Sequence, residues 1–318
     1  MEYPTPTKIK KATLVPLSWV ELDPNLNAPF QIAKDLTFEN IEGLIKPQML
    51  SLWSEVVSKR ERDDLLRARF AILHRFDSTG HIGREEAESN DLAFKVFLCL
   101  RIVKPTRATF EPIQVRFNDR SELEVFSFSH NALPPNIPEA DAVNSYGLDD
   151  MMTLKRLWRT FWQLASEGPE HVRRAVRYFN AGFDEVRDPT LQIVVWTMGI
   201  EALFAKAEQQ PEKTLTDLII RAVGANTDIY ANSPIREFIG AKPFTVGSLV
   251  GDLLRLRNVL AHGQWIPSDW KTRDGRDSLA GPSTNYADVL REAAVFILRT
   301  ALLKYLEDRA LSPGQLTP

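Results

Sequence analysis

The segment 257–262, with the sequence RNVLAH, holds three side chains that together could act on a phosphate group. The guanidinium of Arg257 offers a planar fork of donors that fits phosphate oxygens. Histidine side chains give or take a proton near neutral pH, and His262 closes the segment. The amide of Asn258 could fix the histidine tautomer or hold a phosphate oxygen. These three residues are therefore the candidate catalytic residues, for proton transfer beside a bound phosphate.

The spacing alone does not single out this segment. The segments 69–74 and 75–81 also place an arginine five or six residues before a histidine. The residues within the first are all apolar, which predicts a packed helix with His74 as a cap. His81 follows a turn-forming run and is expected to be solvated. We expect local roles for both histidines, and the sequence context favours 257–262.

The element that must position the candidate residues is a helix expected from about 246 to 262, with Gly263 as its terminator. At about 100° per residue, four leucines share the face that packs in the core: Leu249, Leu253, Leu256 and Leu260. Asn258 and His262 point together, away from that face, and Arg255 lies on the same side. This helix therefore presents its polar residues to solvent.

The position of Arg257 raises a geometric question. It lies at the border of the apolar face, where its stem can cover apolar surface while its guanidinium reaches outward. An ideal helix separates Arg257 from His262 by about 140°. The two side chains converge only if the helix ends or distorts near Ala261, or if two protomers share the site.

A second helix, expected at about 189–207, carries a single acidic residue within an apolar stretch. Asp188 is its expected N-cap, and Pro189 takes the first helical position. Glu201 stands in the run WTMGIEALF, so its carboxylate must turn outward or find a partner. A partner role toward Arg257 or His262 is one interpretation, and an ordinary ion pair or a solvated face is the other.

Two motifs in this order resemble a known family. The segments LRNVLAHG and WTMGIEALF are similar to the signature of HEPN ribonucleases, particularly the ApeA-like branch, and the resemblance covers residues 150 to 310. It implies a metal-independent endoribonuclease in which the 2′-OH of RNA attacks the adjacent phosphate. The products would carry a 2′,3′-cyclic phosphate and a 5′-OH. It also implies a symmetric homodimer whose two motifs line one cleft.

Three functional hypotheses follow. The first is an endoribonuclease acting as a toxin or antiphage defence effector, restrained by its N-terminal domain or by an antitoxin or defence-system partner protein. The alternative is a non-catalytic HEPN module that dimerises and binds RNA or a nucleotide. The third is a structural interaction protein, in which 257–262 is only a capped helix end.

Basic residues offer a possible RNA-binding surface. The net charge is −3, so recruitment of RNA would need a local patch. The candidates are Arg255, Arg173, Arg174 and Arg177. Acidic residues close to the last three favour the alternative of a solvated helix face with ion pairs. The sequence has no metal-ligand spacing and no glycine-rich phosphate loop, so we expect no cofactor.

The length of 318 residues fits two domains. We expect a mainly α protein, in which an antiparallel HEPN-type helical bundle follows a smaller mixed α+β domain with a sensing or regulatory role. The expected parts are the N-terminal domain at 1–131, a linker at 132–147, the helical domain at 148–310 and a tail at 311–318.

Sequence periodicity predicts the elements of both parts. In the first, strands are expected at 13–21, 109–117 and 123–128, a helix at 41–73, and a helix or other buried segment at 91–103. In the second, short loops join helices at 151–166, 169–183, 189–207, 214–223, 246–262 and 285–308. A polar loop is expected at 267–283, and its segment 271–276 could cover the cleft.

Cellular location is judged from what the chain lacks. It has one cysteine, Cys99, in an apolar run, and no secretory signal is visible. The longest apolar helix candidate, 289–306, is interrupted by four charged residues and falls short of a membrane span. We expect a cytoplasmic protein without membrane contact.

Overall fold

The computed structural model describes most of the expected elements. The described residues are 9–17, 20–22, 29–42, 63, 66, 68–78, 82–105, 110, 112–117, 123–128, 145–186, 188–204, 212–231, 243–263 and 286–311. The chain forms two compact units, Met1–Pro134 with Asn144–Trp158, and Pro135–Val143 with Arg159–Pro318. The first contains a sheet and the second only helices among its described elements, so the prediction of a mixed part followed by a helical part is confirmed.

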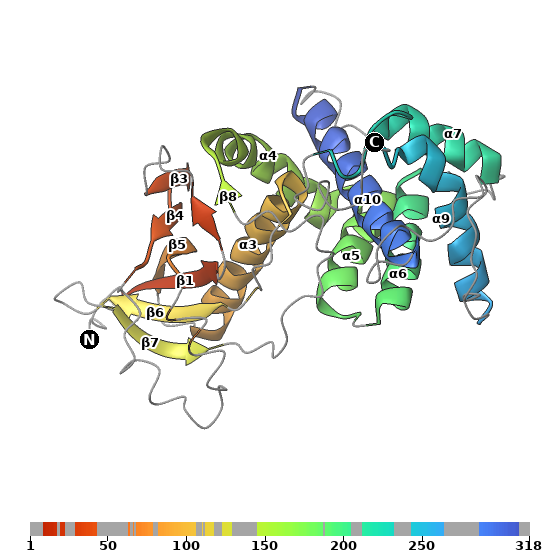
Figure 1. Ribbon diagram of the computed structural model, residues 1–318. Coiled ribbons are helices and arrows are strands. Elements are labelled where there is room, and N and C mark those ends of the chain that lie inside the picture. Colours follow the sequence, from red (N-terminus) through yellow and green to blue (C-terminus); the bar gives the residue numbers. More distant parts are fainter. Residues whose placement is uncertain are drawn as a thin grey trace, which may run out of the picture. The chain divides into compact units, whose positions relative to one another are not determined.

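The first unit is built on a six-stranded antiparallel sheet with the order β3-β4-β5-β1-β6-β7 (Figure 1). The strands are β1 Ile9–Leu17, β3 Phe30–Ala33, β4 Leu36–Asn40, β5 Phe70–Ser78, β6 Ile113–Phe117 and β7 Leu123–Phe128. The strands predicted at 109–117 and 123–128 are thus confirmed as β6 and β7. A separate parallel pair joins β2 (Glu21–Leu22) to β8 (Ser145–Tyr146).

The helix predicted at 41–73 is wrong at both ends of its range, although Asp63 and Leu66 within it are helical. Ile41 is not helical, and residues from Phe70 onward belong to β5, which pairs with both β1 and β4. The apolar run of β5 misled the prediction, because a strand buried on both faces loses the alternation that identifies strands. His74 is therefore a strand residue and not a helix cap. His81 and residues 43–62 lie outside the described residues.

One long helix, α3 (Ile82–Val103), packs against β1 and β5. Its second half is apolar and buried, with Arg101 as the buried exception: Ala93, Val96, Phe97, Leu98, Cys99, Leu100, Ile102 and Val103. Its first half, which begins nine residues before the predicted start at 91, is polar. Apolar periodicity could not predict this half, because polar contacts hold it to the sheet.

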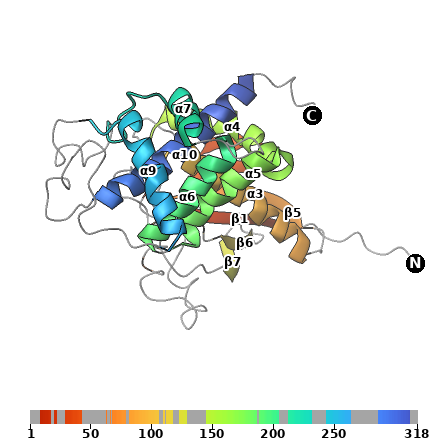
Figure 2. The same ribbon diagram turned by 90° about the vertical axis from the view of Figure 1, so that its right-hand side faces the viewer.

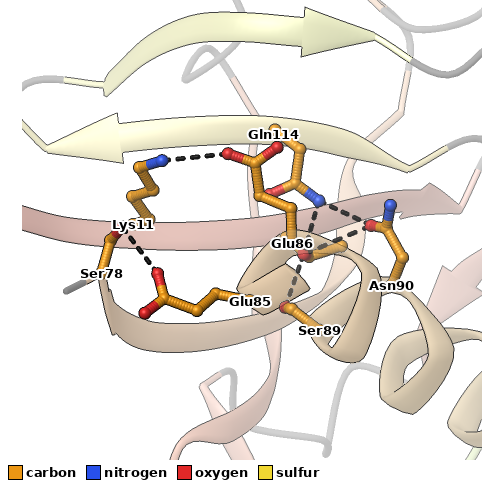
Figure 3. Close-up of polar contacts among 8 residues, drawn as sticks. Lys11, Ser78, Glu85, Glu86, Ser89, Asn90 and Gln114 are labelled. Carbon is orange, nitrogen blue, oxygen red and sulfur yellow. Dashed lines mark hydrogen bonds and ion pairs between the residues drawn. The ribbon is translucent and has the colours of Figure 1, made fainter. Parts of the chain in front are cut away.

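Figure 3 shows most of these polar contacts between α3 and the sheet. Strand register places Gln114, Thr13 and His74 side by side on β6, β1 and β5. The Ser89 hydroxyl lies 2.6 Å from that of Thr13 and 2.8 Å from Nδ1 of His74. Further contacts are Lys11 with Glu86 at 2.9 Å, Ser78 with Glu85 at 2.8 Å, and Gln114 with Asn90 at 2.6 Å. Such mutually bonded buried groups fix the strand register, since a one-residue slip would turn them away.

The second unit is a bundle around α6 and α10 (Figures 1 and 2). Its helices are α5 Glu170–Asp184, α6 Pro189–Phe204, α7 Glu212–Val223, α9 Val246–Ala261 and α10 Tyr286–Leu311. Each overlaps a helix expected from the sequence. No helix among the described residues is long and apolar enough to cross a membrane.

One helix, α4 (Leu148–Glu167), belongs to both units. The sequence placed the start of the helical domain at 148, after a linker at 132–147. The structure instead groups residues 144–158 with the sheet, and only residue 159 onward of α4 with the other helices. The Asp150 carboxylate, in the first half of α4, forms an ion pair with Lys104, which directly follows α3, at 2.7 Å.

The hairpin of α5 and α6 fixes the position of α6. Asp188 caps α6 as predicted, since its Oδ1 accepts the N–H groups of Thr190 at 2.7 Å and Leu191 at 3.1 Å. These two bonds stabilise the carboxylate and lower the pKa of Asp188. Trp196 donates from Nε1 to the carbonyl of Phe179 at 3.1 Å, and a Cβ at Gly182 would lie 2.2 Å from the same indole nitrogen. The indole ring of Trp196 therefore lies directly against the backbone of α5.

Candidate functional site

The end of α9 positions the candidate residues. Leu249, Leu253 and Leu256 are buried as predicted, which orients the helix. The helix ends at Ala261, and His262 is the C-cap, with φ −89° and ψ 10°. Its backbone N–H donates to the Asn258 carbonyl at 3.2 Å, which closes the last turn.

Gly263 ends the helix in the left-handed region, as the sequence predicted. Its φ is +69°, a conformation that other residues adopt only at a cost, and its N–H donates to the carbonyl of Leu260 at 3.0 Å. His262 consequently stands at the point where the chain leaves the helix.

The structure brings three of the predicted residues together. The Nη2 atom of Arg257 forms an ion pair with the Glu201 carboxylate on α6. The Nη1 atom donates to Oδ1 of Asn258 at 2.7 Å. The side chains of Arg257 and Glu201 are 23% and 26% exposed, so the pair lies at the surface without being fully solvated. One guanidinium thus connects α6 to α9.

Burial acts on the pKa of this guanidinium. It lowers the pKa of Arg257, although an arginine remains charged at any physiological pH. The Nε atom is buried and has no hydrogen-bond partner among the described residues. Arg257 is therefore a cation held in place by one carboxylate and one amide.

His262 stands apart from this cluster. It is exposed, and its ring has no partner among the residues that the structure describes. The Oδ1 atom of Asn258 is bonded to Arg257 and not to the imidazole, so this amide oxygen does not fix the tautomer of His262. The helix does end at Ala261, one of the two conditions for convergence, yet no contact joins His262 to Arg257 within the described part of the chain.

All four candidate basic residues are exposed on their helices. Arg173, Arg174 and Arg177 are exposed on α5, and Arg174 forms an ion pair with Glu170 one turn earlier. The interpretation of a solvated, ion-paired face therefore applies to Arg174. Arg255 is exposed on α9, on the same side as Asn258.

One buried pair that supports α9 was missed at the sequence level. Asp252 is 3% exposed, and its Oδ2 accepts a hydrogen bond from the hydroxyl of Tyr286 at 3.0 Å. This bond ties the middle of α9 to the first residue of α10. The signal was present, since an aspartate within an apolar helical stretch demands a partner, but nothing in the sequence pointed to Tyr286 as that partner.

The described residues contain no group of three or more His, Cys, Asp or Glu side chains placed to hold a metal ion. Comparison of the chain with protein-family models, with curated proteins and with solved structures finds no match. The site is therefore interpreted from its own geometry and from the motif resemblance.

Proposed function

We propose that this protein is an endoribonuclease of the HEPN type, which cleaves RNA without a metal ion. Its main support is the cluster of Glu201, Arg257 and Asn258 at the surface, one turn from an exposed histidine at the end of the same helix. Arg257 would hold the phosphate, and His262 would move a proton to or from the reacting oxygens.

The state of Arg257 fits this role. Glu201 contacts Nη2 and Asn258 contacts Nη1, so the guanidinium plane is oriented before any substrate arrives. An oriented donor stabilises the charge that develops on the five-coordinate phosphorus without reorganising during the reaction. Glu201 acts in this proposal as a positioning residue, through Arg257.

Proton balance favours two copies. The attacking 2′-OH must lose a proton, and the departing 5′-oxygen must gain one. One chain offers one His262, and a homodimer with a composite site would offer two. In the cell, we propose a toxin or antiphage defence effector of the cytoplasm, with the first unit or a partner protein restraining it.

A second candidate function is a non-catalytic HEPN module that binds RNA or a nucleotide. The observation that favours it is the absence of a contact between His262 and Arg257 within the described part of one chain. In this case Arg257 would bind a phosphate without proton transfer.

The deciding experiment compares the wild-type chain with His262→Ala on total RNA in the presence of EDTA. We expect wild-type cleavage with 5′-OH ends and cyclic phosphates, and a loss of about a hundredfold or more in the variant. His171→Ala is the matched control, because His171 is also exposed but lies on α5. Equal cleavage by wild type and His262→Ala would contradict the catalytic role, and RNA binding without cleavage by either would favour the second function.

A further inference from the structure

The exposed face of α4 combines apolar and basic side chains in one row. We call this set the α4 row: Leu148, Met152, Lys155, Arg159 and Trp162. Steps of four, three, four and three residues keep the five side chains on one face of the continuous helix. All five are exposed, and the exposed fractions of Leu148, Met152 and Trp162 are 50%, 52% and 42%. The helix therefore presents large apolar side chains to solvent beside two cations.

The charge on this face has one sign. Between 151 and 166 the sequence holds Lys155, Arg156 and Arg159, and no Asp or Glu. On α5, by contrast, Arg174 is paired with Glu170 one turn earlier. On α4 the residue one turn after Lys155 is Arg159, and like charges at this spacing oppose helix formation. The face therefore carries a local cationic field that an acidic partner would neutralise.

The cation nearest the centre of the row is held in place. The Nζ atom of Lys155 lies 5.6 Å from the centroid of the Phe30 ring on β3, which is within cation–π distance. Strand β3 and this part of α4 belong to the same compact unit. A side chain held in this way loses less conformational freedom on binding than one that moves freely in solvent.

The order of residues along the row indicates a helix as the partner. Alternating steps of four and three residues form the seam of two packed helices. Methionine, arginine and tryptophan are also enriched where proteins bind one another. Because the row is apolar at both ends and cationic in the middle, its complement is a helix face with apolar ends and two acidic residues, one turn apart, between them.

Two other anionic partners fit the row less well. A membrane would take up the apolar side chains of a surface helix, but Lys155 and Arg159 occupy the middle of the row that would be inserted. A single RNA strand could contact both cations and stack a base on Trp162. That strand would leave the apolar end at Leu148 and Met152 without a matching surface, whereas an acidic helix covers the whole row.

We propose that the α4 row binds an acidic amphipathic helix of another protein. At about 1.5 Å per residue the row is roughly 21 Å long, so a partner helix of about fifteen residues covers it. The two acidic residues of that helix lie over Lys155 and Arg159, and its apolar residues pack on Met152 and Trp162. This inference goes beyond the proposed function and does not depend on RNA cleavage.

The first test uses two labelled synthetic peptides of about twenty residues, long enough to form a helix. Both carry leucines at the two ends of one face, and between them either two glutamates or two lysines at i and i+4. Fluorescence anisotropy measures their binding to the full chain. We expect the glutamate peptide to bind at least about tenfold more tightly, and more weakly as salt rises. Equal binding of the two peptides, or binding of neither, would overturn the proposal.

A charge exchange in the chain tests the same contact from the other side. Lys155→Glu combined with Arg159→Glu should reverse the preference, so that this double variant binds the lysine peptide instead. The matched control is Arg173→Glu with Arg177→Glu, because these exposed arginines are also one turn apart but lie on α5. The control should keep the preference of the wild type. A double variant on α4 that still prefers the glutamate peptide would overturn the proposal.

A neutral variant tests the apolar end of the row. Met152→Ser should weaken binding of the glutamate peptide about tenfold, since it removes a large apolar contact. Leu191→Ser is the control, because Leu191 is 55% exposed on α6, outside the row, and should bind as the wild type does. Unchanged binding by Met152→Ser would contradict the predicted packing.

The remaining arms examine the other anionic partners. The probes are a 2′-O-methyl oligouridylate, which the proposed reaction cannot cleave, and vesicles that contain phosphatidylserine. We expect both to bind the wild type more weakly than the glutamate peptide does. Tighter binding of either probe, lost in Lys155→Glu with Arg159→Glu, would show that an RNA strand or a membrane occupies the row and would overturn the proposal.

Discussion

At the scale of the residue, the contact between Glu201 and Arg257 can be read in two ways. As a structural ion pair, it joins two helices that also pack against each other. As a positioning contact, it holds the guanidinium toward a phosphate. The two readings differ in what removal of the carboxylate charge should do, because partly exposed ion pairs contribute little to stability.

Glu201→Gln separates these readings. We expect RNA cleavage to fall about tenfold, which corresponds to ~1.4 kcal/mol, because Arg257 loses its orientation. The unfolding midpoint should change little, and the loss should appear in kcat more than in KM. Glu170→Gln is the control, since it removes the partner of Arg174 on the surface of α5. A large loss of stability with unchanged cleavage would assign Glu201 a structural role only.

At the scale of the element, the end of α9 depends on one glycine. Gly263 has a positive φ, and a Cβ there would meet nothing within 4 Å. The cost of a side chain at this position is therefore a backbone cost alone. Since His262 directly precedes Gly263, the same backbone conformation also determines where the chain leaves α9, next to the histidine.

Gly263→Ala is expected to lower the free energy of unfolding by about 1 kcal/mol, because alanine disfavours the left-handed region. Urea denaturation measures this change. Gly83→Ala is the matched control: Gly83 lies in α3, also with nothing within 4 Å of its Cβ position and without a positive φ. Alanine there should leave stability unchanged or raise it. A Gly263→Ala variant as stable as the wild type would contradict the assigned role of the glycine.

Helix ends were predictable because local chemistry defines them. Asp188 and Gly263 each satisfy backbone groups within their own helix, and both were identified from the sequence. The strand β5 and the first half of α3 were not, since distant partners define them. Glu201 and Arg257 could be named individually, but their contact depends on how α6 crosses α9, which no local pattern contains.

At the scale of the whole molecule, the stability of the first unit should depend on pH. His74 is partly buried against Ser89, and burial lowers its pKa, although the nearby Asp35 raises it. The ion pair of Lys11 with Glu86 joins β1 to the same helix that carries Ser89. A folded pKa below the unfolded value means that the unfolded chain binds a proton first as the pH falls.

We therefore expect the contribution of His74 to the free energy of unfolding to be fully present above the usual histidine pKa, about 6.5. This contribution should be lost as the pH falls through the lower pKa of the folded state. Denaturant unfolding at several pH values, followed by the fluorescence of the chain, measures this slope. His74→Gln can still bond to Ser89 but does not titrate, so its slope should be flatter. An unchanged slope in that variant would mean that other groups cause the dependence.

The division of α4 bears on how such a protein could acquire its first unit. Residues 148–158 group with the sheet, and residues 159–167 of the same continuous helix group with the bundle. A different N-terminal unit could not simply be joined to the bundle through a loop. It would have to supply a helix that runs on into Arg159 in phase, so that each side chain keeps its direction. Exchange of regulatory units during evolution would thus be restricted to partners that end in a helix of matching register.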